Sequence, residues 1–317
     1  MATSLFKMPF DAERLKIERI YASDELAKCA DDTLSCQKIR DIYGDLRFFE
    51  LHEDRPCTYT SLVTSLDGRI AFTDAPQGPL IAKMNQHDPA GADTDWFILN
   101  MLRSVSDGVL LGAGTMRAEA DYLCYSFDQD LEDMRVAAGK QPVPWNIVSS
   151  TNGKSIPFDH VLFDTPEVPV MICTSIQGAE VVRAGIHNEH LIVCAPTKDD
   201  VTDEMVEQMK SAAPGTVIVV ATGDARPDTA ATMYALKRFG IDRLLVEAPS
   251  YMHHLVAEHM MDELFCNYSC IYVGGHALTI GESGKEFSSQ DHPHTRMLSI
   301  HSHSDHFFYF RHKFLYD

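Results

Sequence analysis

The sequence predicts an α/β fold with a largely parallel central sheet, helices on both faces of that sheet, and an antiparallel hairpin near the C-terminus. From residue 59 onward, runs of β-branched and apolar residues alternate with segments of helical periodicity. This alternation is typical of a parallel sheet that helices cover on both sides. Residues 297–314 instead contain two alternating runs separated by Ser304 and Asp305, a pattern that indicates a hairpin.

The apolar runs place the individual elements. Parallel strands are expected at residues 59–66, 109–111, 146–149, 168–173, 191–194, 216–221 and 243–246, and a further strand at 262–273. The helix before the second strand is expected to begin at an Asp93 or Thr94 cap. A later helix should run from an Asp228 cap to a stop at Gly240. Another helix is expected at 251–260.

The N-terminal segment is expected to differ from the rest of the chain. Residues 1–55 are charged, have helical periodicity and contain no strand signal, so they are predicted to form a helical extension. This extension would pack on the main domain, residues 56–317, or on a dimer mate. The charged, proline-containing stretch 128–144 is interpreted as a surface excursion.

Composition excludes several classes of function. The chain has 317 residues, of which 45% are hydrophobic, enough for one large domain or two small ones. Its net charge of -19 argues against binding to nucleic acid or to an anionic membrane. No apolar run is long enough for a membrane span, and the N-terminus lacks the apolar core of a signal peptide. A cytoplasmic location is therefore expected.

Neither the cysteines nor the histidines predict a metal site. The cysteines are scattered without a CxxC pair and are interpreted as reduced thiols, including Cys266 and Cys270, which lack further zinc ligands nearby. The C-terminal histidines include His301 and His303, which would share one strand face. They are interpreted as part of an exposed hairpin, with a metal site as the alternative.

Several strand ends carry residues suited to binding a ligand. In open α/β sheets ligands lie beyond the carboxyl ends of the strands, which selects residues 64–68, 112–115, 222–223 and 247–251. The Gly-Ala-Gly loop at 112–114 would let a ligand approach the backbone, although it lacks the third glycine of a Rossmann fingerprint. Glycines that serve only tight turns are the alternative. Glu247 ends a buried apolar run, which favours a ligand-binding role.

Two segments carry a family resemblance. SLVTSLDGRIAF, residues 61–72, and SDGVLLGAGTMRAEADY, residues 106–122, resemble the C-terminal reductase domain of the bifunctional riboflavin-pathway enzyme, and more closely its stand-alone relatives. The deaminase half is absent, because the chain has no HxE with a downstream PCxxC. The resemblance implies a dihydrofolate reductase-like fold and a homodimer. It also implies hydride transfer from NADPH to the ribosyl C1 of 5-amino-6-(5-phosphoribosylamino)uracil or a close analogue.

The resemblance also implies roles for individual residues. Asp67 and Glu247 would orient the substrate as catalytic residues, and Arg103, Leu123 and Glu247 would bind it, with Arg103 on the phosphate. The cofactor-binding positions are Thr64, Gly112, Gly114, Thr115, Glu119, Thr222, Gly223, Pro249, Ser250 and Tyr251. Two of these residues have structural alternatives. Arg103 could form a helix-surface salt bridge, and Asp67 could cap its own Asp-Gly turn.

The chain departs from the family pattern in ways that leave alternatives open. The usual Glu-Gly-Gly is Glu247-Ala248-Pro249 here, and a cis Ala248-Pro249 bond is predicted to preserve the backbone path. At the expected 2′-phosphate position the chain has Ser150 and Thr151, with only Lys154 nearby, so NADH is not excluded. The alternatives are a same-fold reductase of another pterin or heterocyclic substrate, or a nucleotide-binding relative without catalysis.

Overall fold

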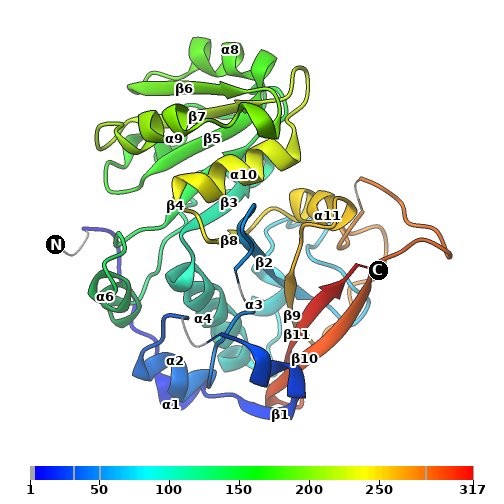
Figure 1. Cartoon of the computed structure of the whole chain (residues 1–317). Helices are drawn as coiled ribbons and strands as arrows, with labels where there is room; N and C mark the ends of the chain where they lie inside the picture. The colour runs from blue at the N-terminus through cyan, green and yellow to red at the C-terminus, as the bar shows by residue number, and fades with distance from the viewer. Residues whose placement is uncertain (1–3, 31–32, 50, 283, 317) are drawn as a thin grey trace.

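The computed structural model describes residues 4–30, 33–49, 51–282 and 284–316. The described chain contains an 11-stranded sheet in the order β1-β10-β11-β9-β2-β8-β3-β4-β5-β7-β6 (Figure 1). The strands are β1 Glu18–Ala22, β2 Cys57–Thr64, β3 Gly108–Gly112, β4 Trp145–Ser149, β5 Val170–Ser175, β6 His190–Ala195, β7 Val217–Thr222, β8 Arg243–Val246, β9 Glu263–Ser269, β10 His294–Ser304 and β11 Phe307–Leu315. Every pairing from β9 to β6 is parallel, and those joining β9, β11, β10 and β1 are antiparallel. The predicted α/β sheet is thus confirmed.

Helices cover both faces of the sheet. In Figure 1, α8, α9 and α10 accompany strands β4 to β7 in the upper half, and α1, α2 and α4 lie in the lower half. The α-helices are α1 Ala12–Leu15, α2 Gln37–Ile42, α3 Leu80–Lys83, α4 Pro89–Val105, α5 Ala113–Ala118, α6 Gln129–Ala137, α7 Val161–Asp164, α8 Ile176–Gly185, α9 Asp203–Lys210, α10 Thr229–Phe239 and α11 Pro249–Ala257. Short 3₁₀ turns lie at Asp24–Lys28 and Lys198–Asp200.

The central strands are apolar throughout because both of their faces are buried. In β7, Val219 packs into a core shared with α4 and α8, whereas Ile218 and Val220 pack into a second core shared with α10 and α11. Each buried aliphatic side chain of this kind stabilises the fold by about 1.5–3 kcal/mol. This two-sided burial makes the strands recognisable as continuous apolar runs.

The prediction that residues 1–55 contain no strand is wrong. Strand β1 pairs antiparallel with β10 at the edge of the sheet, and all five of its side chains are exposed. An edge strand with no buried face leaves no apolar alternation to detect. The rest of the segment packs on the main domain, since Leu15, Ile17, Ile39 and Ile42 belong to the core that contains α4.

Several element boundaries also differ from the predictions. Helix α4 begins at Pro89 after an Asp88 cap, earlier than expected, because proline at the first helical position favours a helix start. Helix α11 begins at Pro249 for the same reason. The stretch predicted as a surface excursion contains α6, whose Arg135 side chain is buried and donates to the carbonyl oxygen of Ser104, 2.8 Å away. The Asp228 cap and the Gly240 stop of α10 are confirmed.

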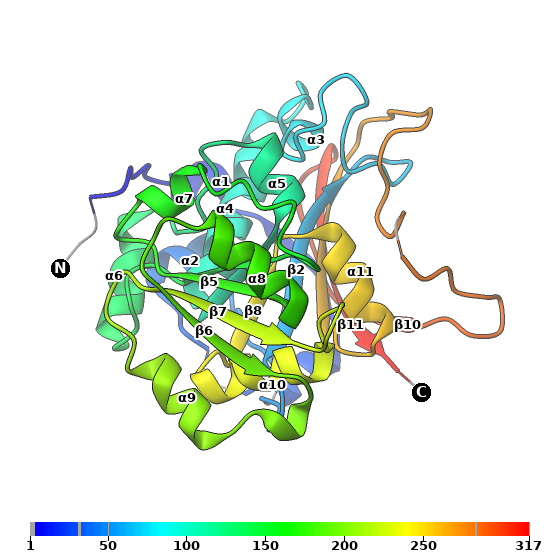
Figure 2. The same ribbon diagram turned by 90° about the horizontal axis from the view of Figure 1, so that it is seen from above.

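The connection between β9 and β10 is long and extends away from the sheet (Figure 2). Asp67 and Arg69, in the turn after β2, hold its first part in place. The backbone N–H groups of Val273 and Gly274 donate to the Asp67 carboxylate over 3.1 and 2.8 Å. Arg69 donates to the carbonyl oxygen of Ala277 over 2.8 Å. Asp67 therefore does more than cap its own turn, because it also joins two loops.

Asp262 should make folding stability dependent on acid pH. It accepts hydrogen bonds from Arg55 and pairs with His52, which ties the N-terminal segment to the start of β9. Burial alone would raise the pKa of Asp262, but Arg55 and His52 lower it from 3.8 to about 2. A carboxyl group with a lowered folded pKa stabilises above its unfolded pKa, and this contribution is lost as pH falls toward the folded pKa.

We expect the wild-type free energy of unfolding to fall by about 2 kcal/mol more than that of Asp262→Asn between about pH 4 and pH 2. Urea unfolding followed by circular dichroism at both pH values measures this difference. Parallel curves for the two proteins would contradict the assignment.

Candidate functional site

A cavity of about 330 Å³ opens at the carboxyl end of the sheet, where the strand-end rule places a ligand. Its walls come from β2, α3, α4, α5 and the chain that follows β8. Residues that line it include Ser61, Leu62, Val63, Ile70, Lys83, Asp95, Trp96, Leu99, Gly114, Thr115, Glu119, Tyr122, Glu247, Pro249 and Leu278. A second cavity, of about 550 Å³, lies at the opposite edge, beside Asp107 and Trp145, at the amino ends of β3 and β4. Because the first cavity alone lies where ligands bind in such sheets, it is the candidate site.

A buried ion pair joins Glu247, which lines this cavity, to Arg103, which lies behind the lining. Arg103 Nε and Nη2 donate to the two carboxylate oxygens of Glu247, each over 2.7 Å. The Arg103 side chain is fully buried and that of Glu247 is 4% exposed. Although burial disfavours a charged guanidinium, Glu247 holds the pKa of Arg103 well above its ordinary value. The pair joins α4 to the end of β8.

Aromatic rings enclose this ion pair and form the cavity wall. The Arg103 guanidinium lies 5.3 Å from the ring centre of Trp96 and 5.2 Å from that of Tyr122, distances suited to cation–π contact. The Tyr122 hydroxyl donates to Glu247 and accepts from Arg103. Burial raises the pKa of both Tyr122 and Cys124, and the nearby Glu247 carboxylate raises them further. Both groups therefore stay protonated at neutral pH.

Arg103 consequently does not line the cavity, contrary to its predicted contact with a substrate phosphate. Besides Glu247, its guanidinium reaches the Tyr122 hydroxyl over 2.7 Å and the carbonyl oxygen of Tyr125 over 3.3 Å. A phosphate would have to displace Glu247 to reach it. The helix-surface salt bridge is not observed either, because the pair is buried. The geometry makes Arg103 a residue that positions Glu247.

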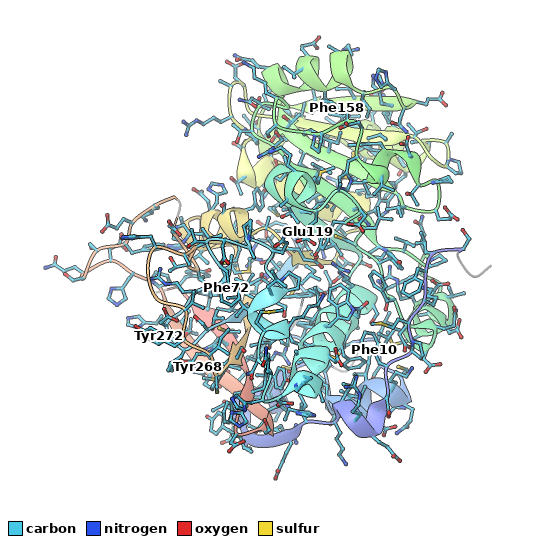
Figure 3. The ribbon with its side chains drawn as sticks, turned by 180° about the vertical axis from the view of Figure 1, so that it is seen from behind. Phe10, Phe72, Glu119, Phe158, Tyr268 and Tyr272 are labelled. Carbon is cyan, nitrogen blue, oxygen red and sulfur yellow. The ribbon has the colours of Figure 1, made fainter. Side chains whose placement is uncertain are left out.

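The start of α5 forms one side of the cavity. Gly114 is exposed there, and a Cβ added at Gly114 would meet no atom within 4 Å. Thr115 and Glu119, predicted with it, also line the cavity, as does Pro249 on the opposite side. Figure 3 shows Glu119 between the upper and lower halves of the molecule. Burial and the neighbouring Asp121 raise the pKa of the Glu119 carboxyl.

The predicted cis bond before Pro249 is wrong, because no peptide bond among the described residues is cis. Proline instead occupies the first position of α11, where a missing N–H costs no intrahelical hydrogen bond. The Met252 N–H donates to the carbonyl oxygen of Ala248 over 2.8 Å, so the helix starts immediately after β8. A trans bond thus brings Pro249 to the cavity wall.

Other predicted site residues lie outside the cavity lining. Thr64 and Gly112 end their strands beside it, and Asp67, Leu123, Ser250 and Tyr251 lie close in sequence to lining residues. Thr222 ends β7 and Gly223 follows it, and β4 and β5 separate β7 from β3. Thr222 is fully buried, and its hydroxyl is 2.7 Å from that of Thr232. The strand-end rule thus selected the ends of β2, β3 and β8, which border the cavity, but also the end of β7, which does not.

Sequence reasoning missed the wall that α3 and α4 contribute. Lys83, Asp95, Trp96 and Leu99 all line the cavity. The apolar spacing of α4 identifies the helix face that packs in the core. Asp95 and Trp96 lie at the border of that face, where the apolar spacing is equally consistent with exposure to solvent. A tryptophan next to an acid at this border is the sequence feature that could have indicated a cavity wall.

None of the helices in the described part of the chain could cross a bilayer. The described residues also contain no group of three or more His, Cys, Asp or Glu side chains that could hold a metal ion.

Comparison with known proteins identifies the family. Residues 57–305 match the RibD C-terminal domain, which is most of the chain. The chain belongs to the RibD C-terminal domain family. It is also 24% identical over 222 residues to the 2,5-diamino-6-ribosylamino-4(3H)-pyrimidinone 5′-phosphate reductase of Archaeoglobus fulgidus, a match that covers 70% of this chain and 83% of that protein.

Solved structures of the family share the fold. A pyrimidine reductase-like protein from Corynebacterium diphtheriae superposes with a TM-score of 0.60 at 17% identity, over 88% of this chain and 98% of its own. The riboflavin biosynthesis reductase Rib7 of Saccharomyces cerevisiae gives a TM-score of 0.51 at 14% identity, over 84% and 93% of the two chains. The predicted dihydrofolate reductase-like fold is thereby confirmed.

The ion pair predicts a large loss of stability when one partner is removed. Arg103→Met leaves the Glu247 charge buried without a cation, and we expect this to lower the free energy of unfolding by about 3–5 kcal/mol. Urea unfolding followed by tryptophan fluorescence measures it.

The double variant Arg103→Met, Glu247→Leu should recover part of this loss, because it removes both charges. A single variant as stable as the wild type would contradict the importance of the pair.

Proposed function

We propose that this chain is an NADPH-dependent reductase that transfers hydride to the ribosyl C1 of 5-amino-6-(5-phosphoribosylamino)uracil or a close analogue. One such analogue is the 2,5-diamino-6-ribosylamino-4(3H)-pyrimidinone 5′-phosphate named for the relative in Archaeoglobus fulgidus. The observation that carries the proposal is a single cavity that brings together the glycine start of α5, Glu247 and an aromatic wall. Family membership supports an oxidoreductase.

The residues around Gly114 suit a dinucleotide cofactor. Free space above the Gly114 backbone would admit a flat ring or a phosphate, and Thr115 and Pro249 border the same space. Reduced nicotinamide would supply the hydride. NADPH is preferred to NADH because Arg117 and Lys154 are exposed close to the end of β4, where Arg117 contacts the carbonyl oxygen of Ser155 over 2.5 Å. These cations could meet a 2′-phosphate.

The protein's own contribution is positioning. Glu247, held by Arg103 and Tyr122, would accept a hydrogen bond from a substrate hydroxyl in a fixed orientation. Trp96, Tyr122 and Leu99 would exclude water from the reacting carbon. Glu119, whose pKa is raised, can hold a proton more readily than an exposed glutamate.

Lys83 is our candidate for the substrate phosphate in place of Arg103. Within the described lining it is the one side chain with a positive charge, and it is exposed at the cavity. It also lowers the pKa of Glu119, so its charge acts inside the cavity. A lysine binds phosphate as a point charge that needs no fixed fork geometry.

A protein that binds a nucleotide without reducing a substrate is the second candidate. It is favoured by the departure at Ala248 and Pro249, where proline has no N–H for a cofactor phosphate. Purified protein, NADPH and each of the two pyrimidine substrates distinguish the two functions. Loss of absorbance at 340 nm that depends on substrate supports a reductase, and cofactor binding without consumption supports the alternative.

Gly114 provides a test of the cofactor site. We expect Gly114→Val to weaken NADPH binding by at least about 100-fold, because the new side chain occupies the space proposed for the cofactor. Quenching or enhancement of NADPH fluorescence gives the dissociation constant. The control is Ala137→Val on α6, which places a valine at an exposed helical position outside the cavity lining. Equal affinities in a folded Gly114→Val variant would rule out this site.

Lys83 provides a test of the phosphate site. We expect Lys83→Ala to raise KM for the phosphorylated substrate by about 10-fold or more, the effect of one charged hydrogen bond. KM for NADPH should stay unchanged. Lys210→Ala, at the opposite edge of the sheet, is the matched control. If Lys83→Ala raised KM equally for the dephosphorylated substrate, Lys83 would not bind the phosphate.

A further inference from the structure

Asp95 is a carboxylate in the cavity that no step of the proposed reaction uses. It lies on α4 next to Trp96, and it lines the cavity. Its hydrogen bond within the described chain joins Oδ1 to Asn267 Nδ2 over 2.6 Å. No lysine, arginine or histidine of the described residues forms an ion pair with it. Burial raises its pKa to about 6, although Asn267 lowers it, so the side chain is ionised at neutral pH.

The surroundings of Asp95 form a short polar strip in an apolar wall. Asn267, on β9, is 1% exposed, and its Oδ1 atom has no hydrogen-bond partner among the described residues. Ser61, on β2, also lines the cavity, and its hydroxyl lies 3.5 Å from Asn267 Nδ2. Leu62, Trp96 and Leu99 border these groups. The half-buried Asp95 carboxylate forms no ion pair within the described residues, and the buried Asn267 Oδ1 has no partner there, so a ligand that donates hydrogen bonds would stabilise both groups.

The charges of the cavity limit what this strip can bind. Asp95, Glu119 and Glu247 line it together with a single cation, Lys83, and Arg103 already neutralises Glu247. A phosphate beside Asp95 would face an uncompensated like charge, so the phosphate belongs near Lys83. The Asp95 side of the cavity therefore suits the ring of the substrate, with its N–H groups turned toward the carboxylate.

The two candidate rings differ at the C2 position. The pyrimidinone carries an amino group at C2 beside N3–H, which gives two adjacent donors that a carboxylate accepts together. The uracil carries a carbonyl oxygen at C2, whose lone pairs would oppose an ionised carboxylate. A site built to accept two hydrogen bonds discriminates strongly against a ring that offers an acceptor in place of one donor.

We propose that Asp95 accepts hydrogen bonds from the N3–H and C2-amino groups of a 2-amino-4-oxopyrimidine and so selects this ring over the corresponding uracil. The inference rests on the proposed function, because it assumes that the pyrimidine occupies this cavity. It assigns the cavity a substrate that still carries its C2 amino group. The reaction that removes this group would then act after the reduction.

The test uses binding without turnover. The reduced forms of both substrates, 2,5-diamino-6-ribitylamino-4(3H)-pyrimidinone 5′-phosphate and 5-amino-6-ribitylaminouracil 5′-phosphate, are titrated into the 317-residue protein in a calorimeter at neutral pH. We expect the wild type to bind the 2-amino compound at least about 10-fold more tightly. Asp95→Asn should reduce this preference to less than about 3-fold, because its neutral amide can also donate to a carbonyl oxygen.

Two variants keep the test specific. Asp93→Asn removes an exposed charge from the same helix outside the cavity and should retain the wild-type preference. Asp95→Ala serves if Asp95→Asn does not fold. Equal binding of the two compounds by the wild type, or an unchanged preference in Asp95→Asn, overturns the inference and leaves the reductase proposal standing. Failure of the wild type to bind either compound overturns both.

Discussion

The buried ion pair between Arg103 and Glu247 is the interaction on which the rest of the site depends. It connects the last turn of α4 to the end of β8, and both α4 and the chain after β8 contribute residues to the cavity lining. A buried ion pair contributes little net stability over an apolar contact of the same shape, but losing one partner is costly. The pair therefore acts mainly by holding side chains in place. Arg103 fixes both carboxylate oxygens of Glu247, and its guanidinium contacts the rings of Trp96 and Tyr122.

The mouth of the cavity depends on a second set of contacts. The turn after β2 and the start of the β9–β10 connection are joined by Asp67 and Arg69, and the Ile70 N–H donates to the carbonyl oxygen of Leu278 over 2.9 Å. Ile70 and Leu278 both line the cavity. Ser65 and the two loop amides hold the pKa of Asp67 well below its ordinary value, although burial opposes them. The catalytic role of Asp67 stays a prediction, and its carboxylate also shapes the opening, because it joins loops far apart in sequence.

The sequence predicted those features that a local pattern encodes. Strands such as β7 are buried on both faces and read as apolar runs, and the cap and stop of α10 are local signals. Strand β1 has no buried side chain, so nothing local distinguishes it. Gly114, Glu119 and Pro249, which were predicted as site residues, line the cavity, whereas Arg103 does not. Only tertiary structure reveals that its charge is already satisfied by Glu247, 144 positions away.

Asp95 was not predicted as a site residue for the same reason, because its role depends on contacts that only the tertiary structure shows. An acid in the first half of a helix is common and favours the helix dipole, so its sequence context gives an ordinary explanation. In the structure the half-buried Asp95 carboxylate instead lines the cavity, accepts a hydrogen bond from Asn267 and forms no ion pair with the described residues. The two acids of the inner cavity thus differ in kind. Glu247 is neutralised by the protein and can orient a neutral hydroxyl, whereas Asp95 is left for the ligand to satisfy. In a protein with a net charge of -19, an anionic group of a ligand would therefore be attracted to the Lys83 side of this cavity and repelled from the Asp95 side.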